Sequence, residues 1–400
     1  MNDHDSSQRA TGRKRRRRPL AAVAAASAVA LLAIAGCSSS TNDSPDPASA
    51  SSSATVDAAV TTAKSALQPY LSEPTEIGPA APLGSAPPKK VIGQVNCSEP
   101  TCALLSDYLE QAANALGWKV VSVTATATDP GAAIQQLIDA GVNYVVETAY
   151  TSDTFRQQMA ELKQKHIPLF EVASTDVPQG PANDIYGDIM DASAQAQWGR
   201  IESDWAIVDS GGKADVVTVN IPSYPVLAAQ SQAEKAEFAK NCPSCRFSEL
   251  DVTVDDLTQG QIPQEVVSYV QANPSVNYIQ FTDPQDEAGV VSALRSAGLL
   301  SKVKIYGSAA QASQFKEISN GTSAAWQIAP QPYIQWAVVD QMARLAVGKW
   351  TVAEERSAAL VPWFLLTDHT TAAKFAASTD PYPWPGPGNY QAAFKAVWGV

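Results

Sequence analysis

The sequence predicts an α/β protein with two lobes, each built on a doubly wound parallel sheet. From Lys90 onwards, short runs of β-branched residues alternate with helical patterns of ten to fifteen residues, which is typical of βα units. The alternation restarts at Asp215, so the chain holds two βα blocks of similar size. The folded part, roughly 310 residues, is long enough for two domains of ordinary size.

The first block is predicted from apolar periodicity and capping residues. Gly117 and Gly141 stand where helices are expected to end, and Asp129-Pro130 is typical of a helix start. The expected strands cover residues 91–95, 118–124, 144–146 and 168–172, and the expected helices cover 104–116, 131–140, 153–165 and 191–208.

The second block follows the same rules, with Gly298 and Gly348 where two helices are expected to end. The expected strands cover residues 215–219, 246–253, 276–281, 303–306 and 325–328, and the expected helices cover 228–240, 263–272, 286–297 and 334–347. Residues 380–389 are rich in Pro and Gly, so we expect no regular structure there.

The N-terminus has the pattern of an export signal. A basic cluster, Arg13 to Arg18, precedes an apolar run from Leu20 to Ala35 and then Cys37. This predicts a signal peptide over residues 1–36. The position of Cys37 resembles the bacterial lipobox, which implies cleavage before it and lipid on its thiol and amine. A single transmembrane anchor remains an alternative because the apolar run is nearly long enough to span a bilayer; a twin-arginine signal is a second.

Lipid on Cys37 would hold the chain on the extracytoplasmic face of the cell membrane. Residues 37–89 then form a tether and lead-in to the first lobe. Within it, residues 38–56 are too polar to bury apolar surface and are expected to be flexible, while residues 57–70 are expected to form a short amphipathic helix.

Charge excludes one class of partner. Residues 1–36 hold seven of the 28 Lys and Arg and two of the 40 Asp and Glu, so the rest of the chain has 21 basic and 38 acidic residues. A nucleic-acid-binding protein needs a basic surface, so we expect no nucleic acid partner.

The cysteines after Cys37 form two close pairs, which in an exported chain predicts two disulfides, Cys97–Cys102 and Cys242–Cys245. The second pair is also a C-x-x-C, so a redox role is the alternative. No His lies near either pair, and we expect no metal.

Candidate binding residues follow from the topology. Ligands of open α/β sheets bind outside the carboxyl ends of the strands. Amides, hydroxyls, carboxylates and tyrosines cluster there, which suits a neutral, hydroxyl-rich ligand. The main candidates are Asn96, Tyr150, Ser174, Asp176, Asn220, Tyr224, Asp283, Ser308 and Gln331, with Thr148, Thr282 and Gln327 beside them. The alternative is that such residues only cap the helices that follow.

Three stretches carry a resemblance to a known family: residues 129–146, Phe281-Thr282-Asp283 with the Ala-rich helix after it, and residues 361–367. Over residues 90–372 the chain resembles the type I periplasmic binding proteins of the ribose- and galactose-binding kind, the substrate receptors of bacterial ABC importers. The resemblance implies that a three-strand hinge joins the lobes, with crossings near Asp191, Gln331 and Val361. It implies an N-terminal lobe of residues 90–191 plus 332–360, a C-terminal lobe of 192–331 plus 361–385, and a C-terminal tail of 386–400.

The chain departs from the sugar-binding pattern of that family. No Arg follows Ser174-Thr175-Asp176, and Gly307-Ser308-Ala309 lacks the family's carboxylate. Gln331 stands one place from the expected glutamine. A sugar-like ligand and a small cyclic or aromatic one both stay open.

The expected function is therefore a monomeric solute receptor that delivers a small ligand to the transmembrane subunits of an ABC permease. A sensory receptor of the same fold, signalling to a membrane kinase or chemoreceptor, is the alternative. An enzyme is not expected, since the sequence has no G-x-S-x-G, P-loop or H-E-x-x-H motif. No cofactor is expected.

Overall fold

The computed structural model describes residues 47–75, 77, 81–97, 100–126, 128–359 and 361–400. The expected signal peptide and Cys37 lie outside these residues. No helix within the described part is long and apolar enough to cross a membrane.

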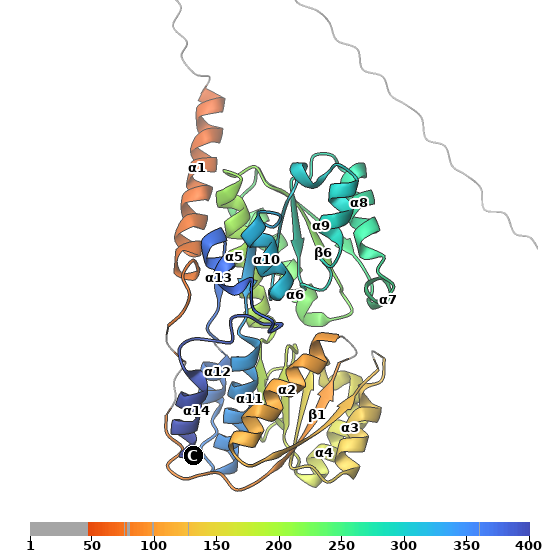
Figure 1. Cartoon of the computed structure of the whole chain (residues 1–400), viewed down its shortest axis with the longest axis vertical. Helices are drawn as coiled ribbons and strands as arrows, with labels where there is room; N and C mark the ends of the chain where they lie inside the picture. The colour runs from red at the N-terminus through yellow and green to blue at the C-terminus, as the bar shows by residue number, and fades with distance from the viewer. Residues whose placement is uncertain (1–46, 76, 78–80, 98–99, 127, 360) are drawn as a thin grey trace, which may run out of the picture. The chain divides into compact units, whose positions relative to one another are not determined.

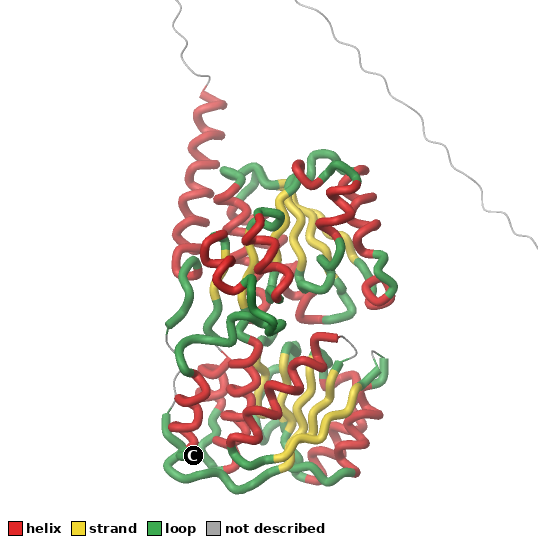
Figure 2. Tube along the Cα trace, in the orientation of Figure 1, coloured by secondary structure: helices red, strands yellow, loops and turns green. Residues whose placement is uncertain are grey.

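The first lobe is built on a five-stranded sheet of parallel strands in the order β2-β1-β3-β4-β5 (Figures 1 and 2). The strands are β1 (Val91–Asn96), β2 (Lys119–Thr124), β3 (Tyr144–Thr148), β4 (Leu169–Val172) and β5 (Ile185–Ile189). One face is covered by α2 (Pro100–Ala115) and α11 (Gln331–Ala346), and the other by α3 (Pro130–Asp139) and α4 (Arg156–Lys165). Strands covered on both faces read as apolar runs, which is why they were predictable.

The second lobe is built on six strands in the order β11-β10-β9-β8-β6-β7, and only β11 runs antiparallel to its neighbour. The strands are β6 (Asp215–Asn220), β7 (Arg246–Asp251), β8 (Tyr278–Phe281), β9 (Lys304–Gly307), β10 (Ala325–Ile328) and β11 (Phe364–Leu366). The covering helices are α5 (Ala192–Asp209) and α6 (Pro225–Asn241) on one face, with α8 (Ile262–Ala272), α9 (Val290–Ser296) and α10 (Ala312–Asn320) on the other. The predicted fold class, two lobes with mostly parallel sheets, is confirmed.

Short helices complete the two lobes. They are η1 (Gln68–Tyr70), η2 (Ser152–Phe155), α7 (Val254–Thr258), η3 (Leu300–Lys302), α12 (Val352–Ala359) and α13 (His369–Phe375). Two disulfides join Cys97 to Cys102 and Cys242 to Cys245, with Cα atoms 5.6 and 5.3 Å apart.

Strand β5 was not expected. Its sequence, Ile185-Tyr186-Gly187-Asp188-Ile189, includes a glycine and an acidic residue, and both are uncommon in strands. A Cβ at Gly187 would lie 2.0 Å from Oε1 of Gln341 on α11, so a larger residue here would force the Gln341 side chain to move. The close approach of this helix, which the local sequence does not encode, covers the strand.

The chain passes between the lobes at Met190–Asp191, at Ala329–Pro330 and beside Val361. Two further segments also join them. One is the lead-in after α1, where Leu83 N donates a hydrogen bond of 2.9 Å to Val397 O. The other is the Pro-rich segment that precedes α14 (Tyr390–Trp398).

Helix α1 (Pro47–Leu67) packs on α5 of the second lobe (Figure 1). It begins ten residues earlier than expected, because Pro is favourable in the first helical turn and Ala has high helix propensity. Ala63 and Leu67 are buried. The residues expected to be flexible thus include the first half of this helix.

Helix α14 occupies the segment expected as a tail, and it packs on α11 of the first lobe. Trp398 is fully buried and stacks on Trp336, with ring centroids 5.4 Å apart. Its Nε1 donates a 2.8 Å hydrogen bond to Asp340 Oδ1. The C-terminus is therefore part of the first lobe's core.

Candidate functional site

A cavity of about 100 Å³ lies at the carboxyl ends of strands from both sheets, where ligands of such folds bind. Its walls are mostly apolar, formed by Cys97, Cys102, Leu105, Ala149, Val172, Ala173, Met190, Trp198, Val226, Leu227, Pro284 and Ala309. The polar residues in the walls are Thr101, Thr148, Gln195, Tyr224, Thr282, Asp283, Gln331 and Tyr382.

Four cavity-lining residues have a strained backbone. Ala149, Ala173 and Met190 directly follow β3, β4 and β5, and Ala309 lies two residues after β9; their φ angles are 73°, 59°, 66° and 56°. Positive φ is unfavourable for residues with a Cβ, and such strain clusters at functional sites. In contrast, only two further described non-glycine residues, His166 and Asp184, share this feature. The strain thus marks the same edge of the sheets as the cavity.

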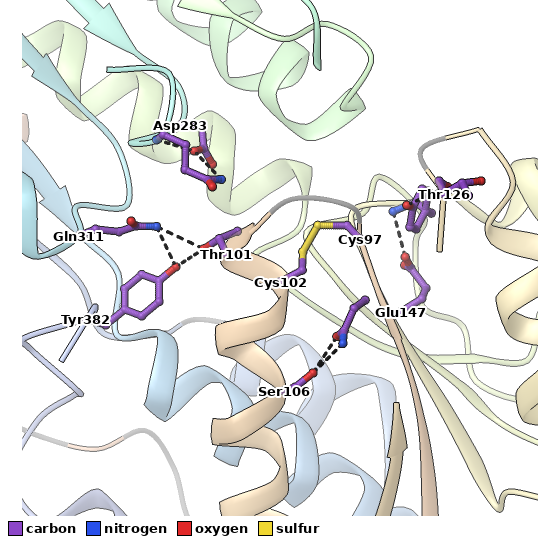
Figure 3. Close-up of a disulfide and its surroundings, with 12 residues drawn as sticks. Cys97, Thr101, Cys102, Ser106, Thr126, Glu147, Asp283, Gln311 and Tyr382 are labelled. Atoms are coloured by element: carbon purple, nitrogen blue, oxygen red, sulfur yellow. Dashed lines mark hydrogen bonds between the residues drawn. A yellow bond between two sulfur atoms is a disulfide. The ribbon is translucent and has the colours of Figure 1, made fainter. Parts of the chain in front are cut away.

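The first lobe supplies the Cys97–Cys102 disulfide to the cavity wall (Figure 3). Both cysteines are buried, between the end of β1 and the first turns of α2. Asn96 fixes this region, because its Nδ2 donates to Ser106 Oγ at 2.7 Å while Ser106 Oγ donates to its Oδ1 at 3.0 Å. The disulfide and Leu105 make this wall apolar.

The wall near the crossings carries two buried carboxamides. Gln195, on the first turn of α5, and Gln331, at the start of α11, are 3% and 5% exposed. The Oε1 atom of each has no hydrogen-bond partner among the described residues, and the same holds for Nε1 of Trp198 beside them. Buried polar groups are normally paired. The cavity therefore has hydrogen-bonding capacity that the described protein atoms do not use.

The second lobe supplies Asp283, directly after Thr282 at the end of β8. Its Oδ1 accepts hydrogen bonds from the backbone N and the Nε2 of Gln285, at 2.9 and 3.4 Å. Burial raises the pKa of this carboxyl, and the bonds from Gln285 oppose the rise. It is the only acidic side chain among the described residues that line the cavity, and none of them is Lys, Arg or His.

A cluster that we name the cross-lobe latch lies beside the cavity and consists of Thr101, Tyr108, Gln311, Asp380 and Tyr382. Of these residues, Thr101 and Tyr382 line the cavity. Tyr382 OH is hydrogen-bonded to Thr101 Oγ1, and Gln311 Nε2 donates to both at 3.4 and 3.3 Å (Figure 3). Tyr108 OH donates to Asp380 Oδ1 at 2.6 Å. Thr101 and Tyr108 belong to α2, whereas Pro381 O accepts from Ala312 N of α10. The latch therefore joins the two lobes.

The structure brings three of the nine main candidates to the cavity, namely Tyr224, Asp283 and Gln331, together with Thr148 and Thr282. Asn96, Tyr150, Ser174, Asp176, Asn220 and Ser308 are not among the lining residues, and neither is Gln327.

The candidates outside the cavity wall have structural partners. Tyr150 donates from its OH to Thr126 O at 3.2 Å. Asp176 Oδ2 accepts from Ser152 N at 2.6 Å, and Ser174 N donates to Asp188 Oδ1 at 3.3 Å. Thr282 Oγ1 donates to Asn220 Oδ1 at 3.5 Å. Ser308 binds Gln230 and Glu202, and Gln327 Oε1 accepts from Ala309 N. These contacts support loops and helix starts around the cavity.

Sequence reasoning missed part of the site. Gln195 and Trp198 could have been found, since they follow Asp191 and the start of a helix after a crossing points toward the cleft. Tyr382 carried no such signal, because it reaches the site from a Pro-rich segment far along the chain.

A row of buried acids lies behind the first lobe's strand ends. Glu147, Glu171 and Asp188 occupy equivalent positions on β3, β4 and β5. Burial raises the pKa of all three well above their usual values. No group of His, Cys, Asp or Glu in the described residues is arranged to hold a metal ion. None of the three lines the cavity, so this row of acids is not part of the candidate site.

A larger cavity of about 640 Å³ lies beside the crossings, lined by Tyr70, Asp191, Trp363 and others. It shares Trp198 with the smaller cavity. We assign the site to the smaller cavity, because that one lies at the strand ends and is lined by the strained residues.

A model of the periplasmic binding protein domain matches residues 98–349. The chain belongs to the periplasmic binding protein family. Its fold and that of its structural neighbours are of the type I kind, found in solute-binding proteins of ABC transporters. The family implies that the folded part works outside the cytoplasm.

Several solved structures share the fold. A carbohydrate transporter protein from Acidothermus cellulolyticus in complex with myo-inositol is 15% identical, with a TM-score of 0.61, over 72% of this chain and 97% of that one. A 5-methylthioribose-binding protein from Thermotoga lettingae is 16% identical, with a TM-score of 0.63, over 80% of this chain and 99% of that one. The fructose-binding periplasmic domain of a hybrid two-component system is 16% identical, with a TM-score of 0.60, over 72% and 93%. No curated protein matches the chain.

Proposed function

We propose that this periplasmic binding protein is an extracytoplasmic receptor that binds a small sugar-like solute between its lobes and delivers it to an ABC permease. The observation that carries the proposal is the cavity at the strand ends of both sheets. It is lined by residues with a strained backbone and by buried polar atoms without a hydrogen-bond partner among the described residues. Structural neighbours with the same fold bind myo-inositol, 5-methylthioribose and D-allose. In this proposal Cys37 carries the lipid anchor, and the protein acts as a monomer without catalysis.

Binding requires the cavity to widen. Its volume of about 100 Å³ is below the ~300 Å³ at which small-molecule sites usually begin. Because its walls come from two lobes, the lobes must separate for entry and close again on the ligand. The permease would recognise the closed form.

The test is thermal melting of the purified full chain in detergent against pentoses, hexoses, polyols, nucleosides and small aromatic compounds. A ligand at ~100 times its dissociation constant stabilises the folded state by about 2.7 kcal/mol, which gives a shift of several degrees. We expect a shift with a sugar or polyol, and a smaller radius of gyration by X-ray scattering with that ligand. A tight ligand without any compaction would refute the closing-lobe proposal.

A sensory receptor is the second candidate, because one structural neighbour is the periplasmic domain of a hybrid two-component system. The two functions separate in cells that lack the protein. Transport predicts loss of uptake of the radiolabelled ligand, whereas sensing predicts normal uptake and loss of a ligand-induced transcriptional response.

A further inference from the structure

The walls of the cavity are mostly apolar. Their apolar part includes the Cys97–Cys102 disulfide and Leu105 from the first lobe, and Val226 and Leu227 from the second. Each of these side chains is at most 9% exposed. A hydroxyl placed against them would lose its water without gaining a hydrogen bond, which is unfavourable.

The polar groups of the cavity favour hydrogen-bond donors on the ligand. Gln195 Oε1 and Gln331 Oε1 are acceptors without a partner among the described residues. The Asp283 carboxylate is a third acceptor, and its Oδ1 already accepts two hydrogen bonds from Gln285. Hydroxyl or N–H groups of a ligand would complete these pairings.

The cavity disfavours anionic ligands. The described cavity wall holds no Lys, Arg or His, and its one charged residue is Asp283. A carboxylate or phosphate would be buried without a counter-charge and close to a like charge, and both effects cost free energy.

We propose that the cleft selects uncharged polyols with one apolar edge, such as deoxy, O-methyl or alkylthio sugars, over fully hydroxylated sugars and sugar acids. This deepens the proposed function and rests on it. The donor-bearing part of the ligand pairs with Gln195, Gln331 and Asp283. The apolar edge contacts the disulfide and Leu105 of the first lobe and Val226 of the second.

The experiment is isothermal titration of the full chain in detergent with matched sugars that differ only at carbon 6. The gluco, galacto and manno series are each tested as the parent hexose, the 6-deoxy sugar and the uronate. Ribose is tested against 5-deoxyribose and methyl riboside. In the series that binds, we expect the deoxy or methyl sugar to bind about fivefold more tightly than its parent or better, and the uronate not to bind.

The variant Val226→Thr adds a hydroxyl to the wall with little change in shape, and we expect the preference to shrink by about fivefold. The control is Val121→Thr on β2, an exposed position away from the cavity, which should leave the preference unchanged. If the wall variant does not fold, the comparison of sugars on the unaltered protein still decides.

The outcomes separate the two proposals. Parent sugars that bind as tightly as their deoxy forms, or uronates that bind more tightly, overturn this inference and leave the receptor function standing. If no sugar of any series binds, the proposed function fails, and the inference falls with it.

Discussion

Asp204 on α5 is buried, and its Oδ1 has no hydrogen-bond partner among the described residues. Its pKa is raised to about 7, chiefly by burial and also by the nearby Glu237, while Lys240 and Arg200 oppose the rise. A carboxyl whose pKa is higher in the folded than in the unfolded protein makes the fold less stable as pH rises.

We therefore predict a pH-dependent gain in stability for Asp204→Asn. The wild type loses free energy of unfolding as pH rises from about 4 to about 7, because the unfolded chain ionises first. At pH 8 the variant should be more stable by on the order of 2–4 kcal/mol, and most of that difference should vanish at pH 4.5. Urea unfolding of both proteins at the two pH values measures it. An equal difference at both would show that ionisation is not the cause.

Gln331 is the lining residue best placed to test the cavity. Replacing it by Ala removes a carboxamide whose Oε1 has no described partner in the ligand-free structure. We predict about tenfold weaker binding of the ligand found by thermal melting, with little change in the melting temperature of the free protein. Gln264→Ala, at an exposed position on α8, is the control and should bind normally. Unchanged affinity in Gln331→Ala would place the ligand elsewhere.

At the scale of elements, the longer helices and the strands other than β5 could be predicted, whereas several short helices could not. The apolar runs of β1 and β6 and the capped helix α3 follow from local pattern. Helices α10, α12, α13 and α14 have seven to nine residues, too few for a clear period. Their stability comes from the surfaces they pack on.

Helix α14 provides a test at this scale. Trp398 is fully buried, stacks on Trp336 and binds Asp340. We predict that Trp398→Ala lowers the free energy of unfolding by about 3–5 kcal/mol. The control is Val400→Ala, since Val400 is 55% exposed at the same end of the chain and should change stability little. A loss below 1 kcal/mol, measured by guanidinium unfolding, would mean that the C-terminal helix is not part of the core.

The site was predictable only where it follows the strand-end rule. Tyr224, Asp283 and Gln331 follow strands and line the cavity. Ser174 also follows a strand and Asn220 ends one, but neither lines the cavity. The difference depends on the arrangement of the first helical turns and the C-terminal segment around the cleft. This arrangement is determined by tertiary contacts, such as the backbone hydrogen bond from Ala312 N to Pro381 O, and not by local sequence.

At the scale of the whole molecule, the cross-lobe latch links ligand affinity to the relation between the lobes. Tyr108 OH donates to Asp380 Oδ1 but does not line the cavity. A bond that exists only when the lobes are together adds its free energy to ligand binding, because the ligand needs the same arrangement.

Loss of this bond in Tyr108→Phe should therefore weaken ligand binding by about fivefold, corresponding to about 1 kcal/mol. The radius of gyration of the ligand-free protein should increase in X-ray scattering. Tyr269→Phe on α8 is the matched control and should change neither quantity. Wild-type affinity together with an unchanged radius in Tyr108→Phe would show that the latch does not favour closure.

Because α1 packs on α5, the N-terminal segment would connect the membrane to the second lobe and not to the first. If lipid is attached at Cys37, the ten residues to Pro47 can reach no more than ~35 Å. The start of α1, the helix that packs on the second lobe, then stays within that distance of the membrane. The first lobe is then the one that swings relative to the membrane when the cleft opens. A permease beside the protein would contact one lobe that stays in place and one that moves. Only the position of the moving lobe would tell the permease whether a ligand is bound.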